Sequence, residues 1–197
     1  MRSWPVSPAK RRAPATTHGP APRGVAAAGV RILGLDPGLR ATGWGVIDCE
    51  GNTLSYVADG TIAPDPALPL AERLKALFVG IGEVVARYRP AECAVEDTFV
   101  NKNPTSTLKL GHARAAALLG AAQRDVAVFE YKPNLVKKSV VGAGHAEKAQ
   151  IAAMVAVLLP GSRAGSPDAA DALAVAVCHA HHRATRGRLA AGLEAAE

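Results

Sequence analysis

The stretch RILGLDPGLRATGWGVI, residues 31–47, decides the fold. Its apolar run ILGL ends in a single acid, Asp36, and a Pro-Gly pair follows at once. This order is typical of a strand, a rigid narrow turn and a second strand that returns beside the first. A carboxylate at the end of a strand, with small residues beside it, would leave room for a cation and a phosphate. The alternative interpretation is that Asp36 only starts a turn.

The rest of the chain predicts a mixed α/β arrangement. Further strands are expected after Gly43 and at residues 53–57, 92–96 and 126–131, and a two-proline loop at residues 61–66. Helices are expected at residues 68–88, from Pro104 with Asn103 as cap, after Pro133, at residues 146–158, and from Pro167 with Ser166 as cap. The helix at 146–158 has only a weak cap candidate, His145. Three antiparallel strands followed by alternating helices and strands imply one domain, a mixed five-stranded sheet flanked by helices.

Residues 1–30 are rich in Pro, Ala and Arg and lack apolar periodicity, which predicts a disordered extension. A basic arm for nucleic acid, an organelle transit segment and an extension from an upstream start site are the three explanations, and we favour the last. The folded domain is expected at residues 31–185, and a flexible C-terminal tail at residues 186–197.

The net charge of +6 lies almost entirely in the extension. Residues 1–30 carry five Lys or Arg and no acid, so the remainder holds 18 basic against 17 acidic residues. A nucleic-acid interface on the domain must therefore come from local basic clusters. The three cysteines lack metal-ligand spacing, and no apolar run approaches bilayer length, which predicts a cytoplasmic protein.

Four acids stand at the ends of predicted elements: Asp36, Glu96, Asp168 and Asp171. Asp168 and Asp171 are spaced i, i+3 and project from one helical face. Converging carboxylates repel one another unless a cation is present, and oxygen ligands without Cys or His select Mg²⁺ or Mn²⁺. A helix-capping acid, a turn acid and a solvated strand end are the alternatives, because spacing alone cannot show convergence.

Four blocks of sequence together resemble the RuvC family of bacterial Holliday-junction resolvases. They are LGLDPGLRATGWGVI, AVEDTFVNKNPTSTLKLGHARA, VFEYKPNLVKKSVVGAGHAEK and SPDAADALAVAVCHAH, and they run in order through residues 31–182. The resemblance implies an RNase H-like fold and a metal-dependent endonuclease that acts in DNA recombination and repair. Residues 1–30 lie outside it.

The resemblance also assigns residue roles. It implies that Asp36, Glu96, Asp168 and Asp171 bind two Mg²⁺ ions per active site, with Mn²⁺ as a substitute, and act in catalysis together with Lys148. Lys137 and Lys148 match the family's phosphate-binding lysines, and Lys148 could help to polarise the scissile phosphate. Lysines suit phosphates as point charges, although a solvated helix face is the usual alternative. Lys138 is expected to be surface.

The loop after Glu96 carries Phe99 and Lys102. An aromatic residue in a polar loop can anchor the loop on the sheet or stack on a splayed base. The family's loop probes the junction centre, so we assign Phe99 and Lys102 to DNA binding. Lys109 and Arg114 on the next helix could touch phosphates or face solvent. The cluster His179, His181 and His182 is not a zinc site and is expected to be surface or to match the helix dipole.

The family's assembly and products complete the prediction. The resemblance implies a homodimer that nicks two strands of like polarity symmetrically and leaves 5′-phosphate and 3′-hydroxyl ends. The helix from Pro104, rich in small residues, is a candidate dimer surface or an internal packing face. The implied partners are four-way junction DNA and a branch-migration motor of RuvA and RuvB type proteins.

Two other functions are alternatives. DPGLRATGWG also resembles the phosphate loop of actin- or sugar-kinase-like ATPases. That fold needs a second Asp-Gly loop and an adenosine site, and the chain has neither. A non-catalytic junction binder is disfavoured because all four acids are intact.

Overall fold

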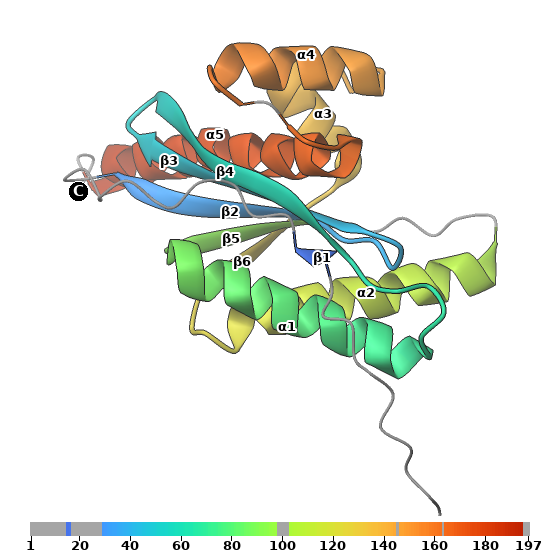
Figure 1. The fold of residues 1–197 in the computed structure, drawn as a ribbon. Helices are drawn as coiled ribbons and strands as arrows, with labels where there is room; N and C mark the ends of the chain where they lie inside the picture. Colours follow the sequence, from blue (N-terminus) through green and yellow to red (C-terminus); the bar gives the residue numbers. More distant parts are fainter. Residues whose placement is uncertain (1–14, 17–28, 98–102, 145, 163, 195–197) are drawn as a thin grey trace, which may run out of the picture.

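The protein folds as one mixed sheet between two helical layers (Figure 1). The computed structural model describes residues 15–16, 29–97, 103–144, 146–162 and 164–194. Its strands are β1 (Ala15–Thr16), β2 (Val30–Asp36), β3 (Thr42–Glu50), β4 (Thr53–Ala63), β5 (Glu92–Glu96) and β6 (Ala127–Tyr131). Its helices are α1 (Leu70–Tyr88), α2 (Pro104–Ala122), α3 (Pro133–Val141), α4 (Lys148–Leu158) and α5 (Pro167–Glu194). No helix in these ranges is long and apolar enough to cross a bilayer.

The strand order is β1-β4-β3-β2-β5-β6. β2, β3 and β4 form the antiparallel part, while β5 and β6 continue from β2 in parallel. The mixed sheet with five main strands is therefore confirmed. The additional two-residue β1 pairs antiparallel with the end of β4 and comes from the segment predicted to be disordered. Most of that segment, 1–30, lies outside the described residues.

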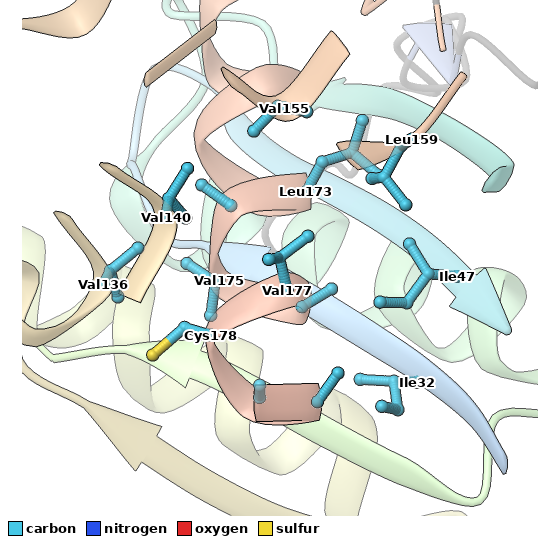
Figure 2. Packing of buried hydrophobic residues seen from close by; sticks show 14 of the residues in the cluster. Ile32, Ile47, Val136, Val140, Val155, Leu159, Leu173, Val175, Val177 and Cys178 are labelled. Atoms are coloured by element: carbon cyan, nitrogen blue, oxygen red, sulfur yellow. The ribbon is translucent and has the colours of Figure 1, made fainter. Parts of the chain in front are cut away.

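The two faces of the sheet carry separate apolar cores, because successive strand residues point to opposite sides. Leu33, Leu35 and Trp44 face α1 and α2. Ile32 and Ile47 face α5, and α3 and α4 cover α5 from outside (Figures 1 and 2). The buried side of α5 includes Leu173, Val175 and Val177 (Figure 2). α5 is thus buried between the sheet and the outer helices.

Local signals placed most helix ends correctly. The Asn103 side chain accepts hydrogen bonds from the amides of Thr105 and Ser106, which confirms it as the cap of α2. α4 differs from the prediction, because its cap is Glu147 and not His145, which lies outside the described residues. Glu147 forms a reciprocal capping box with Gln150, which satisfies two otherwise unpaired backbone donors.

Two boundaries differ from the prediction. β4 continues to Ala63, beyond the expected end at Val57 and into the expected loop, because the nine-residue β3 offers it a long pairing partner. The register shifts between Val46 and Ile47, so the extra residue is absorbed without ending the strand. α5 continues to Glu194, through most of the expected tail at residues 186–197, since its Ala, Arg and Leu residues are strong helix formers.

Candidate active site

Asp36 is the last residue of β2, and the side chain of Thr42 closes the turn that follows it with two hydrogen bonds. The Thr42 hydroxyl accepts a hydrogen bond from the Gly38 amide at 3.2 Å and donates one to the Gly38 carbonyl at 2.9 Å. A Cβ at Gly38 would lie 2.3 Å from the Ala41 carbonyl oxygen, so a side chain does not fit there. The predicted tight turn is confirmed, and it leaves Asp36 at the carboxyl end of a strand inside the sheet.

Glu96 reaches the same edge of the sheet from the neighbouring strand. β5 runs parallel to β2 with Leu35 beside Val95, so the next residues of the two strands, Asp36 and Glu96, are neighbours. The two side chains hydrogen-bond to each other. The carboxyl ends of parallel strands meet at one edge, which explains why residues 60 positions apart come together.

The second pair of acids is carried by the start of α5. The Ser166 hydroxyl accepts a hydrogen bond from the Ala169 amide at 3.1 Å, which confirms Ser166 as the cap of α5. Pro167 is the first helical residue and Asp168 lies in the first turn. The helix dipole favours a negative charge in that turn. Asp171 follows one turn later on the same face.

Three glycines on the sheet let α5 approach closely. A Cβ at Gly43 would lie 1.9 Å from the Asp168 carbonyl oxygen, and one at Gly34 would lie 2.1 Å from the Ala172 carbonyl oxygen. A Cβ at Gly45 would overlap the next turn of the helix in the same way. The missing side chains of these three glycines make room for the helix that delivers the acids.

The electrostatics show that the four acids converge. Burial, reinforced by the charges of Glu96, Asp171 and Asp168 and by the hydrogen bond to Glu96, raises the pKa of Asp36 to about 8. Burial also raises the pKa of Glu96, and the charge of Asp171 adds to the effect. Asp36 therefore carries a proton at neutral pH and donates it to the Glu96 carboxylate. The other three acids lie near enough to Asp36 for their charges to act on it, which spacing alone could not show.

Two lysines, Lys148 and Lys137, lie near the four acids. The Lys148 ammonium, at the first residue of α4, lies 2.7 Å from Asp171 Oδ2, and its side chain is 76% exposed. This hydrogen bond raises the pKa of Lys148. The positive charges of Lys148 and Lys137 also act on Glu96, in the direction that lowers its pKa. Lys137 thus lies near the acids from α3, whereas Lys138 is exposed, as expected.

The donor set of the site fits a hard divalent cation. Its four carboxylates supply only oxygen ligands, which Mg²⁺ and Mn²⁺ prefer. Within the described residues, no three His, Cys, Asp or Glu side chains form a ready metal cage. Asp36 and Glu96 share a hydrogen bond, and the Lys148 ammonium lies against one oxygen of Asp171. Both neutralise charge that a cation would neutralise, so the residues present fit such an ion.

Several other predictions have different outcomes. Phe99 and Lys102 lie outside the described residues. Lys109 is exposed on α2. Arg114, which could have faced phosphate or solvent, instead pairs with Asp97 at 3.2 Å and with Glu130. It therefore anchors the residue directly after Glu96, because two carboxylates neutralise its guanidinium.

His179 is a second correction. It was expected at the surface near a helix end, but its side chain is fully buried in the middle of α5. Its Nδ1 lies 2.8 Å from the Tyr131 hydroxyl and its Nε2 lies 2.6 Å from Glu92 Oε2. The sequence reasoning missed Glu92. The available signal was its spacing, since residues four apart on a strand share a face and Glu96 follows Glu92 by four.

The chain is similar to known proteins over nearly all of its folded part. A family model described as crossover junction endodeoxyribonuclease RuvC matches residues 32–179. The crossover junction endodeoxyribonuclease RuvC of Azorhizobium caulinodans is 62% identical over 154 residues, which cover 78% of this chain and 91% of the relative.

Two solved structures have folds similar to that of this chain. Thermus thermophilus RuvC in complex with a Holliday junction substrate superposes with a TM-score of 0.74 at 33% identity, covering 79% of this chain and 96% of that chain. The yeast mitochondrial Holliday junction resolvase Ydc2, at 12% identity and a TM-score of 0.57 over 80% of this chain and 81% of its own, shares the fold. These neighbours confirm the predicted RNase H-like α/β fold. The family model, the identity to RuvC proteins and the shared fold establish that this chain belongs to the RuvC family of crossover junction endodeoxyribonucleases.

Proposed function

We propose that this protein is a structure-selective endodeoxyribonuclease that resolves Holliday junctions during homologous recombination and DNA repair. The observation that carries the proposal is the convergence of Asp36, Glu96, Asp168 and Asp171 at one edge of the sheet, inside the segment that matches the family. The Thermus thermophilus relative is described in complex with a Holliday junction substrate, which supports the same substrate for this chain.

The four acids are proposed to hold two Mg²⁺ ions per active site, for which Mn²⁺ can substitute. When bound, such ions activate the attacking water and stabilise the leaving oxygen of a phosphodiester. Asp36 must release its proton before it can act as a ligand, because only the ionised carboxylate binds a cation well. The Lys148 ammonium, which now pairs with Asp171, would then be free to contact the scissile phosphate.

The proposed DNA face surrounds these acids. Lys148 and Lys137 approach them from α4 and α3, and we propose that both bind phosphates. Phe99 is proposed to stack on a base at the junction centre, and Lys102 to bind a neighbouring phosphate. These two assignments rest on the family resemblance of the loop after Glu96.

Symmetric cleavage of a four-way junction requires two active sites, so we propose a C2 homodimer. Each site would nick one of two strands of like polarity and leave a 5′-phosphate and a 3′-hydroxyl. We further propose that the protein acts in the bacterial cytoplasm with a branch-migration motor of RuvA and RuvB type proteins.

The test compares a labelled synthetic four-way junction with linear duplex of the same sequence, both in Mg²⁺. Paired nicks in the junction alone are expected. Asp168→Asn and Asp171→Asn should abolish the nicks and keep junction binding, measured in Ca²⁺. Binding without nicks by the unmodified protein in Mg²⁺ and in Mn²⁺ would refute the proposal and leave a junction-binding module.

A further inference from the structure

A second polar cluster links α5 to the sheet, and its Glu92–His179 contact lies about two helical turns from Asp171. It consists of Glu92 on β5, Tyr131 on β6, and His179 and Arg183 on α5. The Glu92 carboxylate lies 2.6 Å from His179 Nε2 and 3.0 Å from Arg183 Nε. The His179 side chain is fully buried, with the Phe129 ring 4.7 Å from its own, centroid to centroid. The cluster joins α5 to two strands.

The direction of the hydrogen bonds in this cluster follows from chemistry. Burial would raise the pKa of Glu92, but the hydrogen bonds and charges of His179 and Arg183 outweigh it, so the pKa is lowered. Glu92 is therefore a carboxylate, which can only accept. His179 Nε2 carries the hydrogen that the Glu92 carboxylate accepts, and His179 Nδ1 shares a second hydrogen bond with the Tyr131 hydroxyl. The four side chains of the cluster are thus joined by hydrogen bonds, whose strength depends on distance and angle.

The distance from Glu92 to Glu96 along β5 nearly equals the distance from His179 to Asp171 along α5. Glu92 and Glu96 lie four residues apart on one face of β5, about 13 Å at 3.3 Å per residue. His179 and Asp171 lie eight residues apart on α5, about 12 Å at 1.5 Å per residue, with buried Val175 midway. Because the two distances match, the hydrogen bond between His179 and Glu92 aligns Asp171 with Glu96.

The alanines of α5 specify this position less sharply than the hydrogen bond does. Ala172, Ala176 and Ala180 present small apolar surfaces to their neighbours, and apolar contact is non-directional. A hydrogen bond weakens steeply with distance and angle. The His179–Glu92 contact therefore restricts sliding of α5 along its axis more strongly than the alanines do.

We propose that Glu92 and His179 are positioning residues for the metal site: they fix the axial register of α5, so that Asp168 and Asp171 meet Asp36 and Glu96. This inference rests on the proposed function of those four acids. It assigns the pair no contact with substrate. Its consequence is that loss of the Glu92 carboxylate weakens cation binding from a distance of about 13 Å along β5.

The experiment compares the full-length protein with Glu92→Leu, Glu92→Gln, Glu92→Asp and Val84→Ala. Leucine removes both acceptors, whereas glutamine keeps an oxygen that can accept from His179. Aspartate keeps the charge but shortens the reach by one carbon–carbon bond, about 1.5 Å. Val84 is fully buried on α1, across the sheet from α5, so Val84→Ala controls for lost stability. Mn²⁺ binding without DNA is titrated by electron paramagnetic resonance, below the melting temperature of every variant, and junction cleavage is measured against Mg²⁺.

The Mn²⁺ dissociation constant should rise roughly tenfold in Glu92→Leu, as is common when a residue that supports metal ligands is lost. Glu92→Gln and Val84→Ala should remain close to the unmodified protein, and Glu92→Asp should lie between. Where Glu92→Leu does not fold, Glu92→Asp carries the comparison. Unchanged Mn²⁺ binding in the Leu and Asp variants, or an equal loss in Val84→Ala, would overturn the inference. Unmodified protein that neither binds Mn²⁺ nor cuts junctions in Mg²⁺ would overturn the proposed function instead.

Discussion

Replacing Gly43 by alanine should separate catalysis from junction binding. A Cβ there would lie 1.9 Å from the Asp168 carbonyl oxygen, and real Cβ atoms essentially never approach closer than 3.0 Å. The start of α5 must therefore move by about 1 Å, because the atoms in conflict belong to two backbones. A misplacement of about 1 Å at a reacting centre can cost about 100-fold in rate. The overpacked contact should also lower the free energy of unfolding by about 1–3 kcal/mol.

The assay is single-turnover cleavage of a labelled junction at saturating Mg²⁺, with junction affinity measured in Ca²⁺ and stability by urea unfolding. Gly43→Ala should cleave about 100-fold more slowly and bind the junction normally, since the proposed DNA-binding lysines are on α3 and α4. The control is Gly29→Ala, where the nearest atom, the Cys49 carbonyl oxygen, would lie at an ordinary 3.5 Å. Wild-type cleavage by Gly43→Ala would refute the argument that this glycine sets the position of Asp168.

Three further predictions follow from the site. The apparent affinity for Mg²⁺ should rise about tenfold per pH unit between pH 6 and 7 and level off above about pH 8. The reason is that a proton on Asp36 competes with the cation, and titration calorimetry at several pH values measures the effect. Lys148→Met should slow cleavage in the single-turnover assay, since the ammonium that lies beside Asp171 is no longer available to contact the scissile phosphate. Ser166→Ala should lower the free energy of unfolding by about 1 kcal/mol through loss of the α5 cap, measured in urea, whereas Ser166→Asp should retain it.

Local sequence signals determined much of the fold and all four candidate acids. The run ILGL before Asp36, the Pro-Gly turn and the caps Asn103 and Ser166 each act over a few residues, so they can be interpreted without knowledge of the rest of the chain. The short apolar run at residues 93–95 assigned β5, and hence Glu96, to a strand end. The family resemblance added roles for Lys137 and Lys148 that periodicity does not contain.

Contacts between distant segments decided the remainder. The sequence marked Gly43 as a small residue in a strand, but only the packed structure shows that α5 occupies the space above it. His179 appeared to be a surface residue because its partners, Glu92 and Tyr131, lie 87 and 48 positions away. The proton shared by Asp36 and Glu96 likewise depends on burial by the whole domain. A sequence pattern specifies what a residue can do locally, whereas burial and partners depend on how the layers pack, which only the tertiary structure determines.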